Sequence, residues 1–126
     1  MHGTVLLLAG DRSLPVDLEE WRARGLIVYH CEEVAHAVKQ FEQIAPDVIV
    51  AMLPADESPS IVPALRSLAD HATSIIVASV PEQRDTVRKE GADSFLLNSG
   101  PASELLYEVH RALILRRSGR RLPWNW

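Results

Sequence analysis

Five short apolar runs, separated by segments of helical periodicity, set the pattern of this chain. Each run is continuous rather than alternating, and rich in Val, Ile and Leu, which is typical of strands covered on both faces of a parallel sheet. The runs are Val5 to Ala9, Leu26 to His30, Val48 to Leu53, Ile75 to Ser79 and Phe95 to Leu97. We expect one strand at each of them.

The segments between these runs carry apolar residues three and four positions apart, as one buried face of a helix requires. Gly25 and Gly91 follow two of them, at the place where helices commonly end. The expected helices are Pro15 to Arg24, Glu32 to Ala45, Ser58 or Ser60 to Ala69, Glu82 to Glu90, and Pro101 to Arg117.

Strict alternation of strand and helix predicts an α/β fold. Short connections and right-handed crossovers turn a (βα)5 pattern into a doubly wound five-stranded parallel sheet. The flavodoxin-like order 2-1-3-4-5 is the expected arrangement, and it places a site at the carboxyl ends of the first, third and fourth strands. Residues 1–117 should form this domain, with residues 118–126 as a tail.

Length and charge narrow the classes of function. The 126 residues suit a single domain, and the balance of 47% hydrophobic and 24% charged residues is that of a globular protein. No apolar run is long enough to span a membrane. The lone Cys31 fits the reducing cytoplasm, which is the expected location. A net charge of −4 argues against general binding of nucleic acid.

Motifs for catalysis and for cofactors are not found in the sequence. There is no glycine-rich nucleotide loop and no hydrolase nucleophile elbow. His30 and Cys31 are adjacent, but no further metal ligand lies beside them in the sequence. His110 is interpreted as a surface residue of the last helix. We therefore expect no enzyme activity, no cofactor and no metal.

Several segments together resemble a known family. Gly91 to Gly100, with the sequence GADSFLLNSG, is similar to the end of a bacterial response-regulator receiver domain, where GAD-x-[YF]-[LI]-x-K-P is usual. Pro46 to Ile49 resembles the family's entry to its third strand, and Ile75 to Ser79 its fourth strand. Pro101 to Leu106 resembles the start of its last helix. The resemblance spans the chain from Val5 to about Leu115, and it implies a CheY-like module of two-component signalling and phosphorelay.

The chemistry of that family depends on a phosphoacceptor aspartate, an acid pair that holds Mg²⁺, a Ser or Thr hydroxyl, and a lysine. Hard cations need carboxylate oxygens, and the hydroxyl and lysine bind the transferred phosphoryl group. Carried over to this chain, only the hydroxyl position, Ser79, keeps its residue type. The acid pair falls at Ala9 and Gly10, with Asp11 just beyond, and the lysine falls at Asn98. The phosphoacceptor falls at Met52 if the strand is aligned on Asp47, and at Val50 if it is aligned on Pro54.

These departures indicate an atypical receiver, or pseudo-receiver, whose pocket has lost aspartyl phosphorylation. Met52 suits a pocket that is filled rather than occupied by a ligand, because methionine fits irregular gaps. One alternative is that a shifted strand brings Asp56 into the site. Another is a small-molecule or nucleotide sensor that uses the strand ends near Gly10, Ser79 and Asn98 as its pocket.

If the pocket does not accept a phosphoryl group, we expect the function to lie on the surface of the domain. In receivers the face formed by the fourth helix, fifth strand and fifth helix contacts partners, so we expect a homodimer or a signalling partner there. The candidate contact residues are Arg84, Arg88, Lys89, Tyr107, Ile114 and Leu115.

The end of the chain combines arginine and tryptophan, and Ser118-Gly119 suggests a hinge that leaves it mobile. Docking of the tail as a peptide is the favoured interpretation. Base stacking, a membrane surface and a linker to an output domain are alternatives. The residues concerned are Arg120, Arg121, Trp124 and Trp126.

Overall fold

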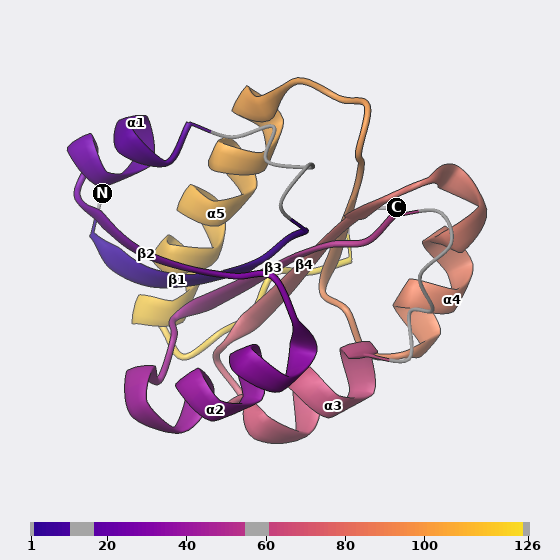
Figure 1. Ribbon diagram of the computed structural model, residues 1–126, viewed down its shortest axis with the longest axis horizontal. Helices are drawn as coiled ribbons and strands as arrows, with labels where there is room; N and C mark the ends of the chain where they lie inside the picture. The colour runs from indigo at the N-terminus through magenta and orange to yellow at the C-terminus, as the bar shows by residue number, and fades with distance from the viewer. Residues whose placement is uncertain (1, 11–16, 55–60, 125–126) are drawn as a thin grey trace.

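A computed structural model describes residues 2–10, 17–54 and 61–124, and it confirms the expected sheet. Five parallel strands pair in the order β2-β1-β3-β4-β5 (Figure 1). The central strands are continuous hydrocarbon, which is why they are buried on both faces. The strands are β1 Gly3–Leu8, β2 Leu26–Cys31, β3 Val48–Met52, β4 Ser74–Ser79 and β5 Ser94–Leu97.

Helices cover the sheet from both sides, α1 and α5 on one face and α2 and α3 on the other, with α4 beside β5 (Figure 1). The helices are α1 Leu18–Ala23, α2 Val34–Ile44, α3 Ile61–Leu68, α4 Arg84–Lys89 and α5 Ala102–Arg117, and a short 3-10 helix, η2, spans Pro81–Gln83.

Some helices begin at other residues than predicted, because local contacts set their first turn. Helix α1 was predicted from Pro15 but is observed from Leu18. Asp17 caps it, since its carboxylate accepts the Glu20 N–H at 3.2 Å. The predicted fourth helix is split into η2 and α4. Pro63 lies in the first turn of α3, where its missing N–H leaves no helical hydrogen bond unmade. Pro15, Ser58 and Ser60 lie outside the described residues.

Alternate residues of each strand enter one of two apolar cores. Val50, Met52 and Ile76 join Trp21 of α1 and the buried face of α5. The residues between them, such as Ile49 and Val77, join α2, α3 and Val87 of α4. The edge strand β2 departs from the expected two-sided burial, since Ile27 and Tyr29 are exposed on one side.

A polar network lies at the amino-terminal edge of β3 and β4. Arg116, near the end of α5, donates to Asp47 at 2.7 Å and to both carboxylate oxygens of Asp70 at 2.9 Å. Its guanidinium, held by hydrogen bonds, keeps the pKa of the Asp70 carboxyl well below its usual range. Asp47 also accepts the Thr4 N–H at 2.8 Å. These charges tie α5 to the sheet on the side opposite the predicted site.

The described part of the tail, residues 118–124, is packed against the domain rather than free of it. Gly119 adopts φ +71°, and this left-handed turn carries the chain away from α5. Leu122 is buried, and its N–H donates to Ser74 Oγ at 2.9 Å. The described tail residues therefore contact the domain through Leu122, while the expected mobility of the tail stays a prediction.

Candidate functional site

The carboxyl ends of the central strands are lined with hydrocarbon. Met52 is the last residue of β3, and Leu53 directly follows it; they are 7% and 2% exposed. Val50, the other candidate for the phosphoacceptor position, lies two residues inside the strand and is fully buried. Of the two candidates, Met52 is the one at the strand end.

The acid-pair positions offer no carboxylate of their own. Ala9 is buried, and its carbonyl oxygen lies 2.9 Å from Nε2 of His30. Gly10 is exposed, and no atom of the described residues stands within 4 Å of where its side chain would be. Asp11 and Asp56, the two acids that sequence reasoning kept in play, lie outside the described residues.

Ser79, the one position that keeps its residue type, is completely buried at the end of β4. Its Oγ lies 2.9 Å from the carbonyl oxygen of Leu53 and 3.2 Å from Oε1 of Gln83, so its single proton has internal acceptors. The bond to Leu53 joins the end of β4 to the residue after β3. The hydroxyl thus serves as a structural tie between two strand ends.

Little space remains beside Met52. The cavity there has a volume of about 20 Å³, enough for roughly one water molecule. Its walls are mostly apolar, with Glu104 of α5 as the one carboxylate. Asn98, at the lysine position, also lines this cavity and is exposed to solvent.

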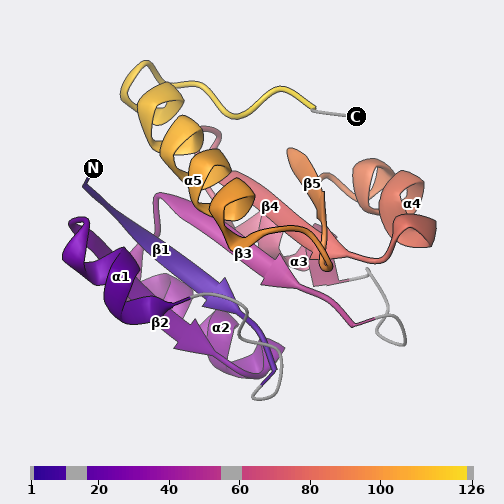
Figure 2. The same cartoon turned by 90° about the horizontal axis from the view of Figure 1, so that it is seen from above.

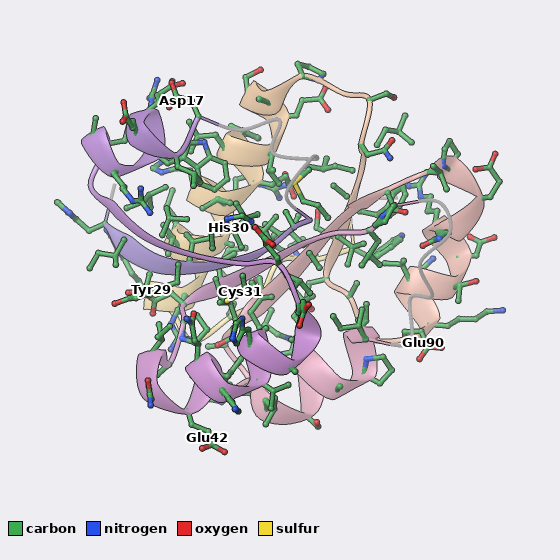
Figure 3. The ribbon with its side chains drawn as sticks, viewed as in Figure 1. Asp17, Tyr29, His30, Cys31, Glu42 and Glu90 are labelled. Carbon is green, nitrogen blue, oxygen red and sulfur yellow. The ribbon has the colours of Figure 1, made fainter. Side chains whose placement is uncertain are left out.

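The described residues here do not fit Mg²⁺, which takes six oxygen ligands in near-octahedral geometry. Among the described parts of the chain, no group of three or more His, Cys, Asp or Glu side chains is placed to hold a metal ion. His30 and Cys31 illustrate why proximity in sequence is not enough (Figure 3). The thiol of Cys31 is buried and donates to Gln40 at 3.0 Å, while His30 contacts Ala9. Burial raises the pKa of the Cys31 thiol.

The surface around β5 is hollowed on both of its sides. A groove of about 420 Å³ lies between β5 and α5, and another of about 350 Å³ lies between β5 and the start of α4. Leu97, Tyr107 and Ile114 expose 46%, 61% and 49% of their surface. We call this surface, formed by α4, β5 and α5, the α4–β5–α5 face.

The structure sorts the predicted contact residues of this face. Arg88, Lys89, Tyr107 and Ile114 are exposed, and Arg84 lines the groove beside β5. Leu115 is half-buried against the core that contains α1 and α5, so it offers less free surface than predicted.

A third groove, of about 370 Å³, lies between α1 and α5 and was not predicted from the sequence. Trp21 and Leu106 supply apolar walls, and Tyr107 stands between this groove and the one beside β5. His110 lines it, with Nδ1 enclosed and without a hydrogen-bond partner among the described residues. The expectation of a simple surface histidine is therefore only half right.

Sequence reasoning also missed a buried acid that fixes α5 to β5. Glu108 is 6% exposed and accepts from Ser94 Oγ at 2.8 Å and from Arg111 Nη1 at 2.6 Å. Charged side chains are rarely buried without such partners. The sequence signal was present but weak: Glu108 falls on the apolar stripe of the last helix.

Comparisons with solved structures match this fold to receiver domains. A CheY-like receiver domain protein from Methanospirillum hungatei JF-1 is 14% identical, with a TM-score of 0.76 over 94% of this chain and 99% of its own. The signal receiver domain of a putative Luxo repressor protein from Vibrio parahaemolyticus is 22% identical, with a TM-score of 0.72 and 94% of each chain covered. A LuxR family DNA-binding response regulator from Silicibacter pomeroyi is 20% identical, with a TM-score of 0.72 over 96% of this chain and 94% of its own.

The class that the fold defines is thus the flavodoxin-like architecture of response-regulator receiver domains. No protein-family model and no curated protein matches the sequence. In the described residues, no helix has both the length and the apolar character needed to cross a membrane.

The buried bond of Ser79 makes a prediction about stability. Ser79→Ala should lower the free energy of unfolding by about 1–2 kcal/mol, because the buried Leu53 carbonyl loses its donor. Urea denaturation at neutral pH measures the change. Ser99→Ala, at an exposed serine after β5, is the matched control and should change it by less than about 0.5 kcal/mol. Equal effects of the two substitutions would contradict a structural role for Ser79.

Proposed function

We propose that this chain is an atypical response-regulator receiver module that acts in bacterial signal transduction through protein–protein contact, without Mg²⁺-dependent aspartyl phosphorylation. The observation that carries the proposal is the filled strand end at Met52, with about 20 Å³ of free volume beside it. Transfer of a phosphoryl group needs cations or donors aimed at the developing charge. The described residues at this edge present hydrocarbon instead.

The state of Ser79 supports the same conclusion. In the family that the sequence resembles, this hydroxyl binds the phosphoryl group after transfer. Here it lies within hydrogen-bonding distance of the Leu53 carbonyl and Gln83 and is fully buried. To donate to a phosphoryl oxygen, the Ser79 hydroxyl would have to give up its hydrogen bond to the Leu53 carbonyl. That carbonyl would then be buried without a donor, which is unfavourable.

The sensor alternative receives less support from the same geometry. Sites for small ligands usually enclose roughly 300–1,000 Å³. The cavity near Met52 and Asn98 is more than tenfold smaller than the lower end of that range. We therefore do not extend the proposal to a ligand pocket at the strand ends.

The surface that we propose for recognition is the α4–β5–α5 face. It combines the exposed apolar side chains of Leu97 and Tyr107 with grooves on both sides of β5. Patches of this kind mark interaction sites when they are contiguous. Similar receivers include a DNA-binding response regulator, so a covalent or separate output domain is one partner consistent with the proposal. We place this activity in the cytoplasm.

A second copy of the chain fits this face by charge. Arg84, Arg88 and Lys89 lie on α4, while Glu104 of α5 lies across β5 in both grooves. A two-fold axis through the face would bring the basic helix of one copy towards the acid of the other. Such opposed charges set the register of a symmetric contact. This supports a homodimer as the form in which the module acts.

The proposed loss of the phosphorylation site predicts that a small phosphodonor will not modify the chain. Incubation with acetyl phosphate and Mg²⁺ should leave the intact mass of the chain unchanged, because no acceptor carboxylate stands at the end of β3. A receiver that accepts phosphate from acetyl phosphate, treated in parallel, controls for the reagent. A stable phosphoryl adduct that disappears in Asp11→Ala or Asp56→Ala would show a working site and overturn the proposal.

The interaction face predicts a position-dependent effect on assembly. Sedimentation should show a mass that rises with concentration from one towards two chains. Ile114→Asp should weaken this association by at least about tenfold, because it places a charge in an apolar contact. Leu68→Asp is the matched control, since Leu68 is also an exposed helical aliphatic residue but lies on α3. A single-chain mass at all concentrations, or equal weakening by both variants, would remove the dimer from the proposal.

A further inference from the structure

The tail does not simply end the last helix; its described residues cross the sheet edge. Residues 118–124, which we call the C-terminal strap, run from the end of α5 towards the side of α4 (Figure 2). Leu122 joins the apolar core on the α1–α5 face of the sheet, and Trp124 packs against the core on the other face. Leu122 and Trp124 are two residues apart and pack on opposite faces of the same sheet.

Hydrogen bonds and charges fix the strap at the amino-terminal ends of β4 and β5. The N–H of Leu122 donates to Ser74 Oγ, and Nε of Arg121 lies 3.4 Å from Oδ1 of Asp93. Asp93 is 8% exposed and also accepts from Ile75 N–H at 2.8 Å and from Arg66 at 2.9 Å. Burial raises the pKa of Asp93, although these donors and both arginines lower it. The strap thus supplies a second cation to a carboxylate that burial would otherwise leave costly to ionise.

The strap ends against α4. The guanidinium carbon of Arg88 lies 5.4 Å from the centre of the Trp124 ring, within the range of a cation–π contact. Trp124 packs against the core cluster that contains Val87 and Phe95. The indole of Trp124 therefore contacts both Arg88 of α4 and the apolar core on this face of the sheet.

Among the described residues, helix α4 buries little of its own surface. It is six residues long, and Val87 is its one buried residue. A helix of this length is not stable without tertiary contacts. Its C-terminal end passes into Gly91, at φ +108°, which lies over the aliphatic stem of Arg66. The position of α4 thus depends on a few contacts, and Trp124 provides one of the largest side chains among them.

We infer that the C-terminal strap is an intramolecular latch: Trp124, anchored through Leu122 and Arg121, holds α4 in place beside β5. The latch connects the end of α5 to α4, so it fixes the spacing of the two helices that flank β5. It does so from the edge of the sheet opposite the strand-end pocket. Release of the strap would free α4. A partner that binds one position of α4 more tightly would therefore also change the equilibrium between the bound and the released strap, by the same coupling free energy.

Hydrogen exchange of the full chain tests the latch directly. Trp124→Leu keeps an apolar side chain but removes the indole face, and Arg88→Gln keeps a helix-forming side chain but removes the charge. Each should speed exchange of the amides at 86–91 by about five- to tenfold, since local opening then costs less. The double variant should raise exchange by less than the product of the two single effects, because the two substitutions remove one shared contact. Amides of β1 and β3 should not change.

Arg84→Gln is the matched control, the same substitution on the same helix but in the groove beside β5. All variants are compared at a chain concentration at which sedimentation shows a single chain, so that the proposed dimer contact of Arg84 plays no part. It should change exchange at 86–91 by less than about twofold. Unchanged exchange in Trp124→Leu and Arg88→Gln would overturn the latch. So would an equal rise in Arg84→Gln, or a uniform rise in every strand. The latch does not depend on the proposed dimer, so sedimentation of the same variants separates a failure of one from a failure of the other.

Discussion

The structure depends on the burial of β1, β3 and β4 between two layers of helices, with hydrocarbon continuing to the carboxyl end of β3. A strand covered on both faces can offer a polar side chain only where it emerges from the sheet. In this chain the emerging residues are Met52 and Leu53, and both are nearly inaccessible. The hydroxyl of Ser79 is turned to the Leu53 carbonyl, which ties the two strand ends together. The described residues at this end of β3 and β4 are therefore part of the core.

The polar interactions of the described chain are concentrated at the opposite edge. Arg116 is shared by Asp47 and Asp70, and Asp93 is shared by Arg66 and Arg121. Charges that are partly buried need such partners, and networks hold better than isolated surface pairs. These two networks lie beneath α5 and the C-terminal strap. They join the last helix and the strap to the amino-terminal ends of β3, β4 and β5.

The sequence was sufficient for the sheet and for one of the two strand-end residues. Continuous apolar runs mark buried parallel strands, so the sequence placed Ser79 at the end of the fourth strand. It left Met52 and Val50 as alternatives for the phosphoacceptor position. The start of the first helix was predicted from Pro15, and the capping carboxylate of Asp17 was missed. The exposed side of β2 could not be read from Ile27 and Tyr29, since an apolar residue at a sheet edge looks the same as one in the centre.

The contacts that define the site and the strap were beyond the sequence for a different reason. The bond from Ser79 to Leu53 joins residues 26 positions apart, and the contact of Leu122 with Ser74 spans 48. Local pattern carries no information about such pairs. Arginine and tryptophan in the tail suggested an external partner, yet Arg121 and Trp124 find their partners in the same chain. Docking of the tail on a partner stays a prediction, while the described contacts of Arg121 and Trp124 lie within the chain.

The most direct measurement of the central claim is the thermal stability of the full chain in Mg²⁺. A site that binds the ion in the folded state alone raises stability, by an amount that grows with the logarithm of one plus the ion concentration divided by its dissociation constant. Because the described strand ends carry hydrocarbon where the ion's ligands would stand, the unfolding temperature in about 10 mM MgCl₂ should equal that in NaCl of the same ionic strength. A higher unfolding temperature in MgCl₂, lost in Asp11→Asn or Asp56→Asn, would show that the pocket retains its metal chemistry.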